Sequence, residues 1–339
     1  MARRAVTILL GTAAALLVMA AVVGAWAWRE YRDFLASPLD IPDTGMVFVV
    51  EPGTGGTAVV RSLAARGLTR ADWKWRLLLR LEPVLLQAGE YRLDHGMAPR
   101  DVVRRLASGE VIRYRFTVVE GWTFKQLRQA LADNAELGHE LPSPKTEQWD
   151  FKSIFPDLDH PEGWFLPETY LFTRGDSDRD LLLRAHQAMQ QALATAWSGR
   201  DTGLPLETPY ELLTLASIIE KETALPQERG QIAGVFVRRL LRGMRLQTDP
   251  TVIYGLGDAF DGDIRRRDLR TDTPYNTYTR HGLPPTPIAL PGRAALEAAA
   301  HPEPGDTLFF VADGSGGHTF SRTLEEHQAA VDRLLNRKP

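Results

Sequence analysis

The sequence predicts an α+β protein that begins with a transmembrane helix and continues into a small α+β domain and a larger mixed α/β domain. Three observations support this. A long charge-free run occupies the N-terminus, strand-like segments alternate with amphipathic helices in the first half, and capped helices alternate with turn-rich segments in the second half. With 339 residues, the chain is long enough for two or three domains and a sizeable core.

Residues 5–28 run for 24 positions without a charge. A helix of that length spans about 36 Å, enough to cross a hydrocarbon core of about 30 Å with some tilt. Trp26 and Trp28 stand where an interfacial aromatic belt is expected, and the two arginines of residues 1–4 favour a cytoplasmic N-terminus. The alternative is a signal peptide cleaved after Ala27, but its apolar region would be only about 7–15 residues long. We therefore expect a single-span anchor.

A tether, a small domain and a linker are expected before residue 161. Residues 29–45 contain two prolines that break a continued helix, which is typical of a tether. Residues 46–134 hold three units of strand, glycine turn and amphipathic helix, such as "FTVVEGWTFKQLRQALADN". Units of this kind resemble LysM modules, which bind chitin-like and peptidoglycan sugars; the alternative is a spacer that binds nothing. Residues 135–160 are polar and contain prolines, so they are expected to form a linker.

The larger domain is expected over residues 161–339, where helix start and stop signals are strong. Two capping boxes precede helices, one at Ser177 and one at Thr208. The second of these helices is predicted from Pro209 to about Leu225. Further elements are predicted from similar signals: helices over 227–242, 293–300 and 324–335, extended or turn-rich segments over 246–257 and 276–292, and a hairpin over 306–320.

The stretch "LASIIEKETALP", residues 215–226, ends a buried helix with two carboxylates two residues apart. On a helical wheel, Glu222 lies on the apolar face and Glu220 lies on a smaller, less apolar surface. A carboxyl group on an apolar face near the C-terminal end of a helix is expected to have a raised pKa, which keeps it protonated near neutral pH as a general acid requires. The alternative is that both face solvent, or that one pairs with a nearby cation: Lys221, Arg229 or Arg238.

Four blocks follow one another along the chain: "LASIIEKET", "GMRLQTDPTVIYG", "NTYTRHGLPP" and "FVADGSGGHTF". Together they resemble the signature blocks of the endolytic murein transglycosylase family, also called MltG or YceG-like, and the resemblance covers essentially the whole chain. In that family the catalytic glutamate lies in the Glu-Lys-Glu block. We carry this role to Glu222, because Glu222-Thr223 also resembles the Glu-Ser pair of lysozyme-like lytic transglycosylases, and Glu220 is the second choice.

The resemblance implies a lyase, without a cofactor, that cleaves the β-1,4 bond between N-acetylmuramic acid and N-acetylglucosamine inside peptidoglycan strands. The cleavage uses no water, leaves 1,6-anhydro ends, and terminates or trims growing strands. It also implies a single-pass protein of the cytoplasmic (inner) membrane with its catalytic domain in the periplasm or an equivalent extracytoplasmic space. The implied partners are glycan strands, peptidoglycan synthases and the division machinery.

A glycan-binding groove lined by the remaining blocks is a further implication of the resemblance. Polar side chains on an extended segment before Pro250 are expected to bond sugar hydroxyls and acetamides, and aromatic rings are expected to stack on sugar faces. The predicted substrate-binding residues are Gln247, Thr248, Asp249, Tyr254, Asn276, Tyr278, Glu168 and Trp164. Core packing is the alternative for each aromatic ring, and a structural salt bridge is the alternative for Glu168.

The sequence is also compatible with two other functions. A muramidase that uses water needs a second carboxylate, for which Asp249 is the candidate; the two groups would lie about 5–5.5 Å apart for retention or about 6.5–9.5 Å apart for inversion. A non-catalytic glycan-binding scaffold of the wall-synthesis machinery would instead leave Glu222 exposed to solvent and far from any groove.

Several classes of site are excluded or disfavoured. The chain has no cysteine, so thiolate zinc sites, iron–sulfur clusters and disulfides are excluded. The net charge of −3 provides no electrostatic argument for nucleic acid. The eight histidines are scattered without a metal-binding motif, so no metal is predicted. A hydrolase triad of His318, Ser321 and Asp313 is disfavoured because the chain has no G-x-S-x-G elbow.

Overall fold

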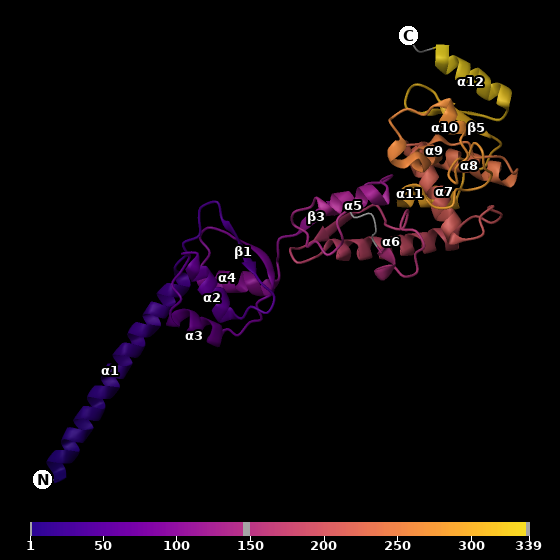
Figure 1. Cartoon of the computed structure of the whole chain (residues 1–339). Coiled ribbons are helices and arrows are strands. Elements are labelled where there is room, and N and C mark those ends of the chain that lie inside the picture. Colours follow the sequence, from indigo (N-terminus) through magenta and orange to yellow (C-terminus); the bar gives the residue numbers. More distant parts are fainter. Residues whose placement is uncertain (1, 145–149, 337–339) are drawn as a thin grey trace. The chain divides into compact units, whose positions relative to one another are not determined.

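The chain forms two compact units in the computed structural model, which describes residues 2–144 and 150–336. Each unit is assembled from more than one stretch of the sequence (Figure 1). The first unit comprises Met1–Tyr114 and Thr173–Gly175, and the second comprises Arg115–Phe172 and Asp176–Pro339.

The division between the units lies at Tyr114, which differs from the boundary expected at residues 135–160. The cause is a strand pairing between distant parts of the sequence: β3 (Tyr114–Thr117) pairs with β4 (Thr169–Phe172). The third of the three similar strand–helix units therefore folds with the second half of the chain.

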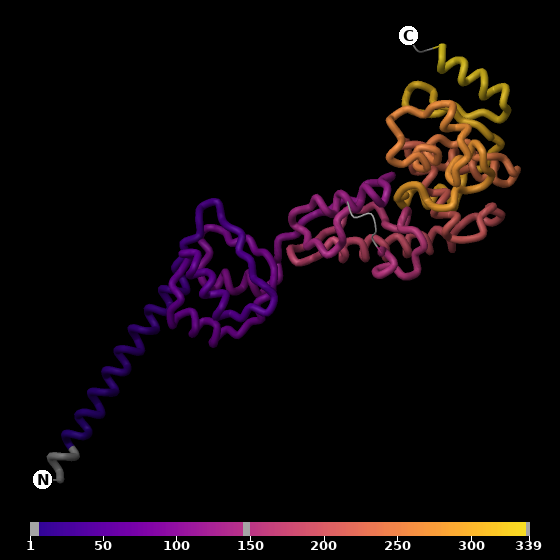
Figure 2. Tube along the Cα trace, viewed as in Figure 1, coloured from indigo at the N-terminus to yellow at the C-terminus, as the bar shows by residue number. Residues whose placement is uncertain are grey.

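A single long helix, α1 (Ala2–Ala36), opens the first unit. Its part Thr7–Ala36 is long and apolar enough to cross a membrane, and Figure 2 shows that it runs into the unit without a break. The helix continues through the first half of the expected tether and ends before Pro38. Tyr31 is only 2% exposed, because it belongs to the core of the first unit. The residues after Trp28 are thus part of the folded unit rather than a tether.

The body of the first unit is a two-stranded antiparallel sheet packed with helices. β1 (Met46–Val50) pairs with β2 (Gly89–Leu93), with Phe48 opposite Tyr91. Side chains alternate between the two faces of a strand, and these two rings lie on the core face, where both are fully buried. The helices are α2 (Gly56–Ala65), α3 (Trp73–Leu81) and α4 (Pro99–Ser108).

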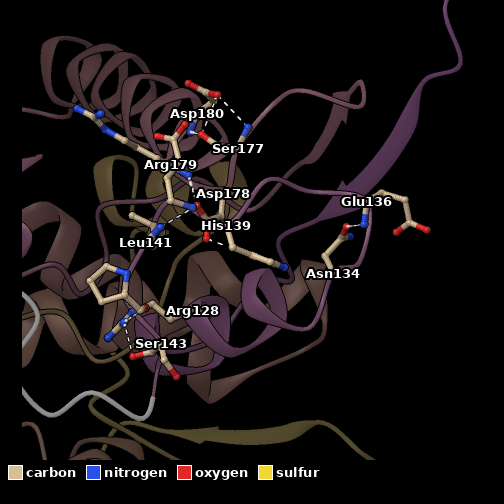
Figure 3. A network of polar contacts seen from close by, with 12 residues as sticks. Arg128, Asn134, Glu136, His139, Leu141, Ser143, Ser177, Asp178, Arg179 and Asp180 are labelled. Atoms are coloured by element: carbon tan, nitrogen blue, oxygen red, sulfur yellow. Dashed lines mark hydrogen bonds and ion pairs between the residues drawn. The ribbon is translucent and has the colours of Figure 1, made fainter. Parts of the chain in front are cut away.

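The second unit begins with β3, and the segment that was expected to be a linker is folded into it. Leu137, Phe155 and Leu158 of that segment are buried. Figure 3 shows Asp178 at the start of α6, where its carboxylate accepts hydrogen bonds from the backbone N–H groups of Glu140 (2.9 Å) and Leu141 (3.1 Å). Residues 145–149 lie outside the described residues. The helices here are α5 (Phe124–Ala132), the 3₁₀ helix η1 (Phe151–Ser153) and α6 (Asp178–Gly199).

The central helix of the second unit is α7 (Pro209–Glu222). All of its residues from Leu212 to Ile219 are buried, in contact with α6, α8 (Arg229–Leu241) and α11 (Arg293–Ala300). The capping boxes predicted at the starts of α6 and α7 are both present. The helix ends at Glu222, slightly earlier than predicted, because Thr223 adopts an extended backbone.

The rest of the second unit confirms the predicted hairpin and corrects one segment. The hairpin is β5 (Phe309–Ala312) with β6 (His318–Ser321), and α12 (Leu324–Asn336) follows it. The segment 246–257 was expected to be extended, but most of it forms a helix; Pro250 lies in the first turn, where its missing N–H has no partner to lose. That helix is α9 (Asp249–Leu256), and the 3₁₀ helix η3 (Gly257–Ala259) follows it. Two further short elements of the second unit are η2 (Pro226–Glu228) and α10 (Arg266–Arg270).

Candidate active site

The two glutamates at the end of α7 lie where the buried helix leaves the core. Residues two apart on an α-helix point about 200° away from each other, so Glu220 and Glu222 face different neighbours. The surroundings of each side chain therefore distinguish them more clearly than the sequence does.

Glu220 is held in a structural network. Its side chain is only 5% exposed, and its carboxylate accepts a hydrogen bond from the backbone N–H of Gly292 at the start of α11 (2.9 Å). Arg229 of α8 lies 3.4 Å from it and also pairs with Glu120 (3.7 Å). Burial raises the pKa of Glu220, and the Gly292 hydrogen bond opposes this. The carboxylate links α7 to α8 and α11.

Glu222 is half-buried and has a different set of neighbours. Its carboxyl accepts a hydrogen bond from the Thr248 hydroxyl, and no Lys, Arg or His within the described part of the chain forms an ion pair with it. Burial raises the pKa of Glu222 to about 7; the Thr248 hydrogen bond and the nearby His318 lower it, and the negative charge of Asp249 raises it. A carboxyl group with such a pKa can both donate and accept a proton near neutral pH.

The segment that approaches Glu222 is held by a second block of the sequence. The backbone N–H groups of Gln247 and Thr248 donate to the carbonyl and the hydroxyl of Thr277, both at 3.1 Å. Gln247 has a φ of 53°, a strained backbone for a residue other than glycine. Asp249 accepts a hydrogen bond of 2.6 Å from the Tyr278 hydroxyl. Residues 247–249 and 277–278, distant in the sequence, thus meet beside Glu222.

A histidine–carboxylate pair also lies at the end of α7. His318 Nδ1 lies 2.7 Å from Glu228, and its backbone N–H donates to the same carboxylate at 2.9 Å. Thr223 also donates to it, at 3.1 Å. Burial raises the pKa of Glu228, but the hydrogen bonds from His318 and Thr223 outweigh it, so that the net pKa is lowered. This pair was not predicted from the sequence, where the histidine of the "GSGGH" turn is its only local signal.

The other predicted site residues have partners away from Glu222. Asn276 is buried, and its amide donates to three backbone carbonyls of residues 268–271 and accepts from the Tyr278 N–H. Trp164 stacks on Tyr210, with ring centroids 5.9 Å apart. Glu168 is exposed and lies 3.8 Å from Arg293, an ion pair of the kind given above as the alternative to substrate binding.

Tyr254 contacts the buried carboxyl of Glu162, which was not predicted as a site residue from the sequence. Its hydroxyl donates to Glu162 at 3.1 Å, and the backbone N–H of Phe124 donates to the other oxygen at 2.9 Å. Burial raises the pKa of Glu162 to about 7. This carboxyl joins α5 to α9. Within the described residues, no group of three or more His, Asp and Glu side chains could hold a metal ion.

Known proteins resemble the chain over most of its length. The profile of the YceG-like family matches residues 48–333. A Bacillus subtilis (strain 168) protein named endolytic murein transglycosylase is 34% identical over 268 residues, which are 74% of this chain and 74% of that protein. A protein of the same name from Streptococcus pneumoniae strain R6 is 28% identical over 359 aligned positions, which cover 95% of this chain and 65% of the longer relative.

One solved structure shows the same architecture. The crystal structure of a YceG-like protein from Listeria monocytogenes superposes with a TM-score of 0.53 at 28% sequence identity. The superposition covers 85% of this chain and 99% of that one.

Proposed function

The chain belongs to the YceG-like family, and from that premise we propose that this enzyme is a membrane-anchored endolytic lytic transglycosylase of peptidoglycan. The substrate is the β-1,4 bond between N-acetylmuramic acid and N-acetylglucosamine within a glycan strand, and the product is a 1,6-anhydro end. The observation that carries the proposal is Glu222, a half-buried carboxyl group whose pKa is raised to about 7.

Glu222 is the general acid and the general base of the proposed reaction. It first donates its proton to the glycosidic oxygen, and the bond to C1 of the muramic acid breaks. The resulting carboxylate then accepts the proton of the C6 hydroxyl as that oxygen bonds to C1. One carboxyl group serves both steps and recovers its proton, and a positioned acid/base of this kind contributes about 10²–10⁴-fold to the rate.

The neighbours of Glu222 support each half of this cycle. The negative charge of Asp249 favours the protonated form that the first step needs, and the hydrogen bond from Thr248 favours the carboxylate that the second step needs. Tyr278 holds Asp249 in place through its hydroxyl. We assign Gln247, Asp249 and Tyr278 to the substrate side of this site, and Asn276 to the internal support of the loop that carries Tyr278.

Glu220 is the less favoured acid, because its carboxylate bonds to Arg229 and to the Gly292 N–H inside the fold. A water-using muramidase is the second candidate reaction. It is favoured by one observation, namely that the carboxylate of Asp249 lies close enough to Glu222 to raise its pKa. In that reaction Asp249 would act as the second carboxylate.

The test is a digest of purified peptidoglycan by the full-length protein, followed by mass spectrometry of the products. The proposal predicts products lighter by one water than hydrolytic muropeptides, with loss of activity in Glu222→Gln and retention in the matched control Glu220→Gln. Reducing ends would establish the muramidase instead. Binding of glycan without any cleavage would favour the non-catalytic scaffold.

The membrane topology and the cellular role follow from the same proposal. Helix α1 anchors the protein with its N-terminus in the cytoplasm and both units outside, where nascent strands emerge. Cleavage of those strands would terminate or trim them, beside the synthases or the division machinery. The first unit, if it acts as the LysM-like module that its repeated strand–helix pattern suggests, would hold the strand. Loss of peptidoglycan binding on deleting its sheet residues, with cleavage of soluble glycan retained, would support that role.

A further inference from the structure

Helix α3 lies beside α1 just beyond the end of the charge-free run. Near its start, Lys74 Nζ is 4.0 Å from Glu30, and Trp75 packs edge-on against Phe34 with ring centroids 5.3 Å apart. At its end, Leu81 lines a cavity of about 440 Å³ together with Trp28 of α1. The start of α3 therefore contacts α1 at Glu30 and Phe34, and its end borders a cavity beside the same part of α1.

The position of these contacts along α1 corresponds to the depth of lipid headgroups. The charge-free run ends at Trp28, and six helical residues from there to Phe34 rise about 9 Å. A headgroup region extends about 5–8 Å beyond the hydrocarbon core on each side of a bilayer. Because α1 is one unbroken helix that packs into the first unit, its insertion places α3 at this depth.

The side of α3 that faces away from the protein is amphipathic. Its inner side is buried, with Trp75 and Leu78 at 1% and 0% exposure. The outer side spans about 140° of a helical wheel. We call it the α3 face, and it comprises the exposed residues Trp73, Arg76, Arg80 and Leu81, followed after the helix by Val84 and Leu85.

The exposure and charge of the α3 face are unusual for a surface in water. Leu85 is 85% exposed and Leu81 is 56% exposed, next to Trp73 at 41%. Its charged groups are two arginines, while the nearby carboxylate of Glu82 is paired with Arg100. Apolar and tryptophan side chains interleaved with arginines are typical of helices that lie in a membrane interface.

We propose that the α3 face binds the headgroup region of the membrane that α1 spans, with a preference for anionic lipid. Leu81, Val84 and Leu85 enter the boundary with the acyl chains, and Arg76 and Arg80 pair with lipid phosphates. This second contact fixes the orientation of the first unit on the bilayer surface. The inference rests on α1 as the membrane anchor and is independent of the reaction proposed for Glu222.

The absence of cysteine from the chain allows a clean test, because any introduced cysteine is the only labelling site. Leu85→Cys carries an environment-sensitive fluorophore in the full-length protein, reconstituted into vesicles that contain anionic phospholipid and lipids brominated on the acyl chains. The expected result is a blue-shifted emission that the brominated lipids quench several-fold more strongly than that of a probe at Ser108→Cys. Ser108 is the matched control because it is exposed and lies at the C-terminal end of α4. Arg100, near the other end of α4, is the residue that lies beside α1.

Two further measurements separate the possible outcomes. A probe at Leu17→Cys, in the middle of the charge-free run, must be quenched; if it is not, α1 is not inserted and the anchor itself is wrong. If Leu17 is quenched but Leu85 is quenched no more than Ser108, the α3 face does not bind lipid and the inference is overturned. A Leu85 probe that is shielded only at high protein concentration, without lipid quenching, would assign the face to a second protein copy instead. Arg76→Gln with Arg80→Gln should reduce the quenching at residue 85 in anionic vesicles but not in zwitterionic ones.

Discussion

Replacing Thr248 by valine tests how the proposed acid is controlled. The Thr248 hydroxyl donates to Glu222, and Thr248 makes no side-chain cap to α9, so valine removes this one hydrogen bond while retaining the shape of the side chain. Hydrogen bonds to charged groups contribute about 1.5–3 kcal/mol. Because this bond stabilises the carboxylate, its loss should raise the pKa of Glu222 by about 1–2 units, at 1.36 kcal/mol per unit.

The measurement is kcat/KM against pH with a soluble glycan substrate. A general acid is active while protonated, so activity should fall as pH rises through the pKa of Glu222, near 7 in the natural protein. In Thr248→Val this alkaline limb should move upward by about 1–2 pH units. Thr251→Val is the matched control: Thr251 is equally buried, but its hydroxyl bonds to the Thr248 carbonyl (2.8 Å) and to Thr277 (2.9 Å). If the pH at which kcat/KM falls is unchanged in Thr248→Val, or shifts equally in both variants, the Thr248 hydrogen bond does not control the pKa of Glu222.

Three further predictions concern the carboxylates around α7. Glu222→Gln should stabilise the fold at pH 8 by up to about 3 kcal/mol and leave it unchanged at pH 4. The pKa of Glu222 in the folded protein is about 7 and exceeds the ordinary value of 4.5. Ionisation of this carboxyl therefore costs folding free energy above pH 7 and nothing below pH 4.5. Thermal unfolding of both proteins at the two pH values measures the difference. Glu220→Gln should lose about 1–3 kcal/mol in urea unfolding, because the partner cation Arg229 stays buried, yet should still release anhydro products. Glu228→Gln should lose about 1.5–3 kcal/mol by the same measurement, since two hydrogen bonds from His318 lose their charge; equal stability would mean that the pair does not hold β6 to the end of α7.

The parts of the fold that the sequence predicts well are those with strong local signals. Thr208, Pro209 and the apolar run after them predict the start and the burial of α7, and the structure confirms both. The hairpin of β5 and β6 is confirmed for the same reason, because its glycine-rich turn lies between its strands. The segment 246–257 was predicted to be extended or turn-rich, but most of it forms α9, in which Pro250 occupies the first turn, where proline is tolerated.

The unit boundary and the surroundings of the site depend on contacts between distant residues. β3 belongs to the second unit only because β4, more than fifty residues later, pairs with it. Glu228 and His318 are 90 residues apart, and no periodicity or spacing connects them. Pairings of this kind form only when the chain has folded, because their partners are selected by the packing of whole elements rather than by their neighbours in sequence.

The amino-acid order alone predicts an apolar N-terminal helix, a buried helix that ends in two glutamates, and the blocks of the YceG-like family. The neighbours of each glutamate, by contrast, depend on how distant parts of the chain pack together. Side chains two positions apart on a helix diverge, and packing brings Arg229 and the Gly292 N–H to Glu220 but Thr248, Asp249 and His318 to Glu222. The difference between the structural carboxyl of Glu220 and the acid proposed at Glu222 therefore lies in which distant segments meet each one, since burial and nearby charges set the pKa of a carboxyl group.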